Sequence, residues 1–216
     1  EAFDRLMSSR PDTAIKIMYK MLTITTQRLE NTSEFVSDMV QFGEEARKRA
    51  VTDPATGLFN RGFLDSALHE QYRKAKQQNV PLCLVMADLD HFNSINEAYG
   101  QEVGDEVIHA VVPILKDHFR DSDILARYGG DEFTFVLPNT DTRTAHELCA
   151  QVREAVGALG VLQGRGGSIE QVTTSQGIAC FPEHAEDISS LREQADQALY
   201  RAKELGRNRT VVVGEQ

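Results

Sequence analysis

Two short acidic segments, each next to a run of apolar residues, carry the side chains best suited to chemistry. Asp88 and Asp90 follow the apolar run 82–87, whereas Asp131 and Glu132 follow two glycines. The apolar run is typical of a strand buried on both faces, and α/β folds place ligands at the ends of such strands. Two carboxylates brought close together repel each other unless a cation lies between them. The pattern favours Mg²⁺, because no His or Cys cluster at metal-ligand spacing suggests a softer ion.

The second acidic segment is predicted to be the tip of a β-hairpin. Residues 124–126 and 133–137 are apolar, strand-like runs on either side of Gly129 and Gly130. Glycine adopts positive φ at little cost, which a tight reversal needs, and its bare backbone lets a ligand approach. Taken alone, the segment is explained equally well as a surface turn with solvated acids.

Three further groups of residues, in order along the chain, extend this pattern. The first is 53–61, with Ala55 where Leu is usual, and the last is 195–203 followed by Gly206, Arg207, Asn208 and Arg209. The middle group consists of 88–92, Ile95, Asn96, Tyr99, Gly100, Gly104 and Asp105. With the hairpin, these groups resemble the motifs of the GGDEF family, the diguanylate cyclases, and span the chain from residue 53 to about residue 210.

The resemblance implies both a fold and a reaction. Residues 52–216 are expected to form an α/β domain of the nucleotide-cyclase and polymerase-palm type, with surrounding helices and a central, mostly antiparallel sheet. The implied reaction condenses two GTP molecules to cyclic di-GMP and releases two pyrophosphates. In each half-reaction a 3′-hydroxyl attacks an α-phosphorus, so catalysis would consist of positioning and charge neutralisation.

Hydrophobic periodicity predicts the elements that must position these residues. Helices are expected near 62–78, 105–119, 141–157 and 189–205. Strands are expected near 82–88, 124–128, 133–137, 173–180 and 210–213. Pro113 should kink or break its helix, and residues 163–170, with three glycines, should form a flexible loop.

The resemblance assigns a metal site and a proton acceptor. Asp88, the backbone carbonyl of Leu89 and Asp131 are expected to bind Mg²⁺, with Mn²⁺ as an alternative ion. Asp131 is also the favoured acceptor for the proton of the attacking hydroxyl, with Glu132 in a supporting role.

The resemblance also implies which residues contact the substrate. Asn96 and Asp105 match positions that read the guanine edge, and Lys203 and Arg207 match positions that contact the triphosphate. The other expected nucleotide contacts are Phe92, Asn93, Gln101, Gly129 and Gly130. Helix termini explain some of these residues without a ligand, since Asp105 is also a suitable helix cap and cations favour a helix C-terminus.

Some positions depart from the family pattern. Asn93 stands where a lysine usually steadies phosphate charge, and Glu97 and Gln101 replace the usual Asp and His. The loss of one cation leads us to expect low activity. An alternative function is therefore a catalytically weak module that binds GTP or cyclic di-GMP as a receptor. A purely structural dimerisation module would leave the nucleotide-site residues unexplained.

An Arg-x-x-Asp sequence precedes the hairpin. Arg120 and Asp123 lie at the spacing and distance from Gly129 that the family uses for product inhibition. Arg120 would clamp a phosphate or stack on guanine, and Asp123 would accept from the guanine edge. The alternative is a surface ion pair, worth about 0–1 kcal/mol.

Residues 1–51 are predicted to form a helical stalk outside the catalytic fold. From Ile15, apolar residues recur every seven positions, and a second series starts at Met18. The seam contains two threonines and a glycine, so it should be weak or adjustable. Pro11 marks the helix start, after a short helical stretch. The stalk is expected to bring two copies together, although a helix packed on its own domain fits the pattern as well.

Composition limits the classes of partner. The net charge of −10 and the lack of a basic stripe argue against nucleic-acid binding. Cys83, Cys149 and Cys180 are expected to be reduced core residues. No apolar run approaches 18 residues, the usual minimum for a membrane helix. We expect a cytoplasmic catalytic domain and an upstream sensor beyond this chain, and the full-length protein could be membrane-anchored.

Overall fold

The computed structural model describes residues 2–214, and the chain divides after Ala50 into two compact units. The first unit consists of α1 (Ala2–Ser9) and the 41-residue α2 (Pro11–Val51). Pro11 occupies the first position of α2, where its missing N–H costs no helical hydrogen bond. The predicted helix and its starting point are confirmed.

The predicted apolar stripe of α2 is exposed in the single chain. Leu22 is 65% exposed, Leu29 70% and Val36 53%, at successive seven-residue intervals. Ala14 is the single residue of α2 that is buried among those described. A stripe of large apolar side chains in water is unfavourable, so this surface is suited to association with another helix. No helix of the described residues is long and apolar enough to cross a membrane.

The second unit is built on a six-stranded sheet with the order β1-β3-β4-β2-β5-β6. Its strands are β1 (Phe59–Asn60), β2 (Leu82–Leu89), β3 (Ile124–Arg127), β4 (Glu132–Pro138), β5 (Thr174–Phe181) and β6 (Thr210–Val212). The pairs β1–β3 and β5–β6 are parallel, and the three central pairings are antiparallel. The mostly antiparallel sheet expected for this fold class is confirmed.

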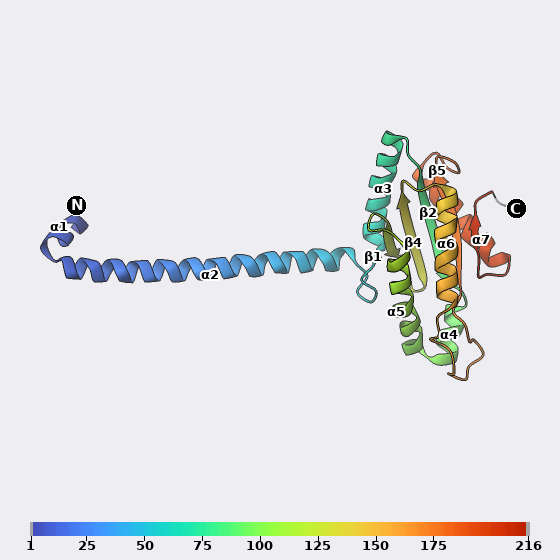
Figure 1. Cartoon of the computed structure of the whole chain (residues 1–216), viewed down its shortest axis with the longest axis horizontal. Coiled ribbons are helices and arrows are strands. Elements are labelled where there is room, and N and C mark those ends of the chain that lie inside the picture. The colour runs from blue at the N-terminus through green and yellow to red at the C-terminus, as the bar shows by residue number, and fades with distance from the viewer. Residues whose placement is uncertain (1, 215–216) are drawn as a thin grey trace. The chain divides into compact units, whose positions relative to one another are not determined.

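Helices cover both faces of this sheet, as Figure 1 shows. They are α3 (Arg61–Gln78), α4 (Phe92–Tyr99), α5 (Gln101–His118), α6 (Thr142–Gly157) and α7 (Ile188–Glu204). One core contains Val85, Val107 and Val152, from β2, α5 and α6, and the other contains Leu68, Leu84 and Leu191, from α3, β2 and α7. Because β2 contributes alternate residues to both cores, it is buried on both faces, as its apolar run predicts.

The structure adds two elements that periodicity missed. β1 is only two residues long, and α4 is an eight-residue helix directly after β2. Gly100, with φ of 88°, ends α4 and lets the chain enter α5 at once. α5 therefore begins at Gln101, four residues before its predicted start. The remaining predicted helices and strands agree with the structure within two residues at each end.

Pro113 does not break its helix, so that part of the prediction is wrong. α5 runs without interruption from Gln101 to His118. Val111, Val112 and Leu115, which flank Pro113, are each at most 7% exposed. Their burial offsets the lost backbone hydrogen bond, because tertiary packing outweighs local propensity when a helix face lies in the core.

The expectation that all three cysteines are reduced is wrong for two of them. Cys83 on β2 lies directly opposite Cys180 on β5, and the two form a disulfide. The sequence separation of 97 residues hid this pairing. Cys149 remains a free, buried thiol, and burial raises its pKa, which keeps it protonated and unreactive.

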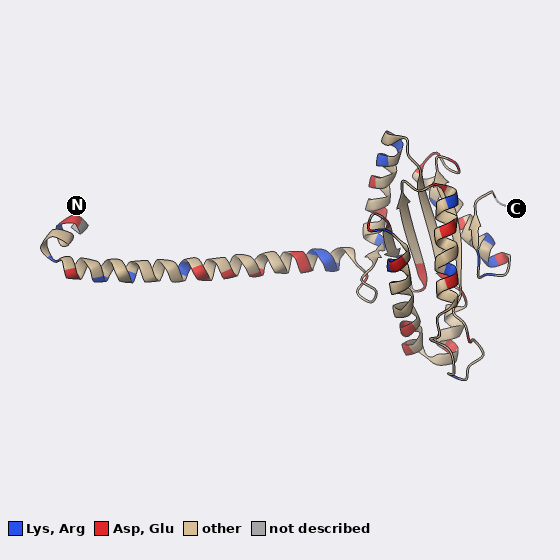
Figure 2. Ribbon diagram, viewed as in Figure 1, with Lys and Arg blue, Asp and Glu red and all other residues tan. Residues whose placement is uncertain are grey.

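The helices of the second unit carry charged residues of both signs. Figure 2 shows acidic and basic residues interspersed on this unit.

We expect Gly177→Ala to destabilise the second unit strongly. A Cβ at position 177 would lie 2.1 Å from Leu199 N and 2.4 Å from Ala195 O, which are backbone atoms of α7. To remove this clash α7 must move away from β5, which should lower the free energy of unfolding by about 3 kcal/mol or more. Thermal denaturation measures the loss. Gly130→Ala is the matched control, since its Cβ would meet nothing within 4 Å, and an equal loss in both variants would contradict this account.

Candidate active site

The predicted acidic hairpin exists, and it pairs with the strand that carries the other acids. β3 and β4 pair in antiparallel fashion, and Tyr128 N donates to Glu132 O across the turn. β4 also pairs with β2, in a register that sets Asp88 opposite Glu132. Leu89 N donates to Asp131 O at 3.1 Å. The two acidic segments, which are about 40 residues apart in sequence, therefore lie side by side.

The two glycines of the hairpin do not have the conformation expected for them. Neither Gly129 nor Gly130 has positive φ, so that part of the prediction is wrong. A Cβ at Gly129 would lie 3.0 Å from Glu132 Oε2, whereas one at Gly130 would meet nothing within 4 Å. Gly129 is thus constrained by Glu132, and Gly130 leaves open space beside Asp131.

Asp88 lies in an unfavourable electrostatic environment for a free carboxylate. Its side chain is 12% exposed, and burial raises its pKa above the ordinary value. Asp131 and Glu132 act in the same direction because their negative charges repel that of Asp88. Lys203 Nζ, at 2.8 Å from Asp88 Oδ2, opposes the shift. The net direction is upward, with burial as the largest cause, so the protein environment by itself disfavours the charged form of Asp88.

This donor set fits a hard divalent cation. Asp88 and Asp131 offer carboxylate oxygens and Leu89 offers a carbonyl, and oxygen donors of this kind suit Mg²⁺. Within residues 2–214 no group of three or more His, Cys, Asp or Glu side chains is arranged to hold a metal. A cation here would need further oxygens from solvent or from a bound phosphate, which Mg²⁺ usually has.

A second part of the site lies where α4 meets α5. Asn96 Oδ1 lies 1.9 Å from the place where a Cβ on Gly104 would be, so the absence of that side chain makes room for the amide. Asp105, the next residue of α5, is exposed, and so are Asn93 and Gln101. Polar side chains of both helices are therefore available to a ligand.

Phe92 plays a different part from its polar neighbours. It is 9% exposed and belongs to the core beneath α4. Its ring also lies 3.2 Å from the position of a Cβ on Gly104. Only the backbone of Phe92 is therefore suited to contact a ligand, and its side chain anchors the start of α4.

The two predicted cations come from the end of α7 and the turn that follows it. Lys203, in the last turn of α7, points to Asp88 at the end of β2. Arg207 is exposed and has φ of 62°, a left-handed conformation that non-glycine residues seldom adopt. The ion pair with Asp88 thus places Lys203 at the carboxylates. Arg207 lies four residues later in the chain, in the turn after α7.

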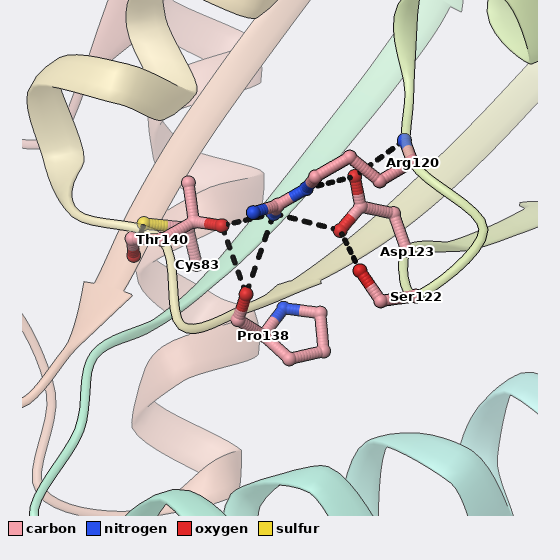
Figure 3. A network of polar contacts seen from close by, with 6 residues as sticks. All are labelled: Cys83, Arg120, Ser122, Asp123, Pro138 and Thr140. Carbon is pink, nitrogen blue, oxygen red and sulfur yellow. Dashed lines mark hydrogen bonds and ion pairs between the residues drawn. The ribbon is translucent and has the colours of Figure 1, made fainter.

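Arg120 and Asp123 form a tight ion pair at the opposite end of β3 from the hairpin (Figure 3). Arg120 Nε donates to Asp123 Oδ2 at 3.1 Å, and Nη2 donates to Asp123 Oδ1 at 2.8 Å. Nη2 also donates to Thr140 Oγ1 and to Pro138 O. The side chain of Asp123 is fully buried, whereas that of Arg120 is 48% exposed.

A cavity of about 330 Å³ opens beside this ion pair. Its lining has charges of both signs and an apolar wall. The charged residues are Lys116, Arg120, Asp121 and Asp123, and the wall includes Leu58, Phe59 and Leu125. Such a lining is suited to a flat ligand that carries both phosphates and hydrogen-bond donors, because cations bind phosphates, acids accept from donors and an apolar wall receives a ring.

Arg127 has a positioning role that the sequence did not reveal. Its Nε and Nη2 donate to Gly130 O at 3.0 and 2.7 Å, and its Nη1 donates to Asp53 Oδ1 at 3.2 Å. Asp53 also accepts from Thr56 N and Oγ1. Both residues lie in recognisable motifs, but their 74-residue separation concealed the contact. Arg127 thereby fastens the carbonyl next to Asp131 to the loop after α2.

Asp88→Asn is expected to raise the melting temperature of the ligand-free protein at pH 7. The raised pKa of Asp88 means that ionisation favours the unfolded state, and this penalty is fully present above the folded-state pKa. Below about pH 3 the carboxyl is mostly protonated in both states, because the ordinary pKa of Asp is about 3.9, so the gain should disappear. Thermal denaturation at several pH values measures it, and a lower melting temperature of the variant at pH 7 would contradict the argument.

The chain matches the family model described as diguanylate cyclase, GGDEF domain, over residues 50–209. It is 39% identical over 160 residues to the probable diguanylate cyclase DgcT of Escherichia coli K12, covering 74% of this chain and 35% of that protein. It is 37% identical over 169 residues to the diguanylate cyclase DgcP of Pseudomonas aeruginosa, covering 78% of this chain and 25% of that protein. The chain thus spans only a minor part of these relatives.

Solved structures of diguanylate cyclases are also similar to this chain. The coiled coil and GGDEF domain of DgcB from Caulobacter crescentus, in complex with c-di-GMP, has a TM-score of 0.79 and 28% identity, covering 87% of this chain and 98% of that one. Diguanylate cyclase SiaD from Pseudomonas aeruginosa, in complex with its activator SiaC, has a TM-score of 0.71 and 26% identity, covering 98% and 80%. Family model, curated relatives and fold agree, and the chain therefore belongs to the GGDEF diguanylate cyclase family.

Proposed function

We propose that this chain condenses two GTP molecules into cyclic di-GMP and two pyrophosphates. The observation that carries the proposal is the β2–β4 register, which sets Asp88 opposite Glu132 and next to Asp131, with Lys203 at Asp88. Three neighbouring carboxylates with a single lysine attract a divalent cation. Such a cation can in turn bind the triphosphate of the nucleotide.

In this proposal Asp88, Asp131 and the carbonyl of Leu89 hold Mg²⁺, or Mn²⁺ in its place. The ion would neutralise charge on the phosphates and orient the α-phosphorus. Lys203 and Arg207 would contact the triphosphate, and the open space at Gly130 would admit the nucleotide beside the hairpin. Lys203 would then exchange part of its contact with Asp88 for phosphate oxygens.

Asp131 would accept the proton of the attacking 3′-hydroxyl. It is half-buried at the hairpin tip, whereas Glu132 is exposed and lies against Gly129. A carboxylate held by its backbone, as Asp131 is through Leu89 N, is positioned better for proton transfer than a free one. Glu132 would support the negative field around the site.

Asn96 and Asp105 would recognise guanine. An exposed carboxylate at the start of α5 accepts hydrogen bonds from the N1 and N2 donors of guanine, and adenine lacks that pair. The missing side chain of Gly104 lets the Asn96 amide lie close against α5, one residue before Asp105. GTP would therefore be preferred to ATP.

Each domain would bind one GTP, so two copies must meet with their hairpins facing. The exposed seven-residue stripe of α2 supports a homodimer, because parallel stalks raise the effective concentration of the two domains. An upstream sensor would act by changing the packing of these stalks.

The activity is tested by incubating the protein with GTP and Mg²⁺ and identifying the product by chromatography. Cyclic di-GMP and pyrophosphate are expected from the wild type, and Asp131→Asn should lower turnover by about 100-fold or more, as loss of a positioned proton acceptor does. GTP binding without product from a dimer would favour a receptor instead, a reading that Asn93, exposed in the first turn of α4, supports. If the protein bound no nucleotide, both the cyclase and the receptor function would be overturned.

Product inhibition is the regulatory part of the proposal. Cyclic di-GMP would bind at the cavity beside Arg120 and Asp123, with Arg120 on a phosphate or the guanine face. Arg120 is already aligned by Thr140 and Pro138, so little ordering would be needed on binding.

We expect Arg120→Ala to raise the concentration of cyclic di-GMP that halves activity by about tenfold or more, because one charge-assisted contact is lost. The initial rate without product should change little, since Arg120 lies at the far end of β3 from the hairpin. Initial rates at increasing product concentrations measure the effect. Arg143→Ala, which removes an exposed ion pair elsewhere, serves as the control. Unchanged inhibition in Arg120→Ala would refute the assignment.

A further inference from the structure

Asp90 is a buried carboxylate for which the proposed reaction has no use. It is 3% exposed, although it lies only two residues after Asp88. A buried charge is costly unless it is paired or fully hydrogen-bonded, so its partners show what it stabilises.

The partners of Asp90 come from two segments beyond residue 170 and include no metal-site residue. Oδ2 accepts from Thr173 Oγ1 at 2.8 Å and from Asn208 N at 3.0 Å, and Oδ1 accepts from Ser175 Oγ at 2.7 Å. Asp90 N also donates to Thr173 O at 2.9 Å. Asp90 thus joins the end of β2 to the start of β5 and to the turn after α7.

The turn after α7 is strained and needs an external partner. Arg207 and Asn208 have φ of 62° and 45°, and two consecutive non-glycine residues in this region are unfavourable. Arg207 N donates to Ala202 O at 3.0 Å, which fastens one end of the turn to α7. The bond from Asn208 N to Asp90 fastens the other end.

We propose that Asp90 is a positioning residue that holds the Arg207–Asn208 turn and thereby aims Arg207 at the substrate triphosphate. Because Arg207 itself is exposed, the backbone of the turn determines where its guanidinium lies. Asp90, which follows the last residue of β2, acts through this turn, whereas Asp88, within β2, contacts Lys203. The proposal rests on the proposed function, which assigns Arg207 to the triphosphate.

The test compares Asp90→Ala with Asp90→Asn. The alanine leaves the donors of Thr173, Ser175 and Asn208 without their acceptor. The asparagine keeps one oxygen for Thr173 and Asn208, and its amide can donate to the Ser175 hydroxyl. Affinity for GTP with Mg²⁺, measured by calorimetry, should fall about tenfold in Asp90→Ala and be largely restored in Asp90→Asn.

A double variant shows whether Asp90 acts on GTP affinity through Arg207 or through a general loss of structure. If Asp90 acts through Arg207, the double variant Asp90→Ala/Arg207→Ala should bind GTP no more weakly than Arg207→Ala alone. Additive losses would overturn the proposal. Asp187→Ala is the control, because it removes the N-cap of α7 and lowers stability while leaving the turn intact. Its GTP affinity should stay at the wild-type value, and an equal loss would also overturn the proposal.

Hydrogen exchange provides a readout that does not depend on the nucleotide. The amides of residues 206–209 should exchange faster in Asp90→Ala than in the wild type, and Asp90→Asn should restore their protection. Unchanged exchange would refute the positioning role even if GTP binds. Conversely, faster exchange in a protein that does not bind GTP would uphold the fastening of the turn and refute the proposed function. Should Asp90→Ala fail to fold, Asp90→Leu, which keeps a side chain of similar length but offers no acceptor to Asn208 N, takes its place in every measurement.

Discussion

The whole site depends on the antiparallel register between β2 and β4. This register sets Asp88 opposite Glu132 and joins Leu89 N to Asp131 O. A shift by one residue would turn every side chain of β2 to the other face, because strand residues alternate. Both faces of β2 are buried in apolar cores, so such a shift is costly. The packing of the sheet therefore fixes the distance between carboxylates that repel one another.

Stability and function compete at the end of β2. Burial and two neighbouring acids raise the pKa of Asp88, and Lys203 only partly compensates. Asp90, two residues later, has the opposite environment, because three donors satisfy its carboxylate. The end of β2 thus holds one acid with a raised pKa and Lys203 as its cation, suited to bind a metal ion, and next to it an acid held by three donors, suited to hold structure. The contrast follows from the different partners of the two acids, because Asp88 lies within β2 beside Lys203, whereas Asp90 lies in the turn after β2 beside three donors.

Much of this arrangement was predictable from local pattern. The apolar run of β2, the hairpin and the long helices follow from periodicity, and the ordered motifs pointed to the family. The errors have physical causes that lie outside any local window. Pro113 stays within α5 because the residues around it are buried, and α4 was missed because eight residues carry little periodicity. Gly129 and Gly130 were assigned positive φ that the turn does not need.

The sequence by itself determined the family, the residue types of the site and the order of most elements, since these depend on motifs and on short-range periodicity. Only the tertiary structure decided which distant residues touch. Arg127 reaches Asp53, Cys83 pairs with Cys180, and Asp90 accepts from Asn208, over separations of 74, 97 and 118 residues. No local signal encodes such contacts, because strand order and register bring the partners together, and these depend on the packing of the whole sheet.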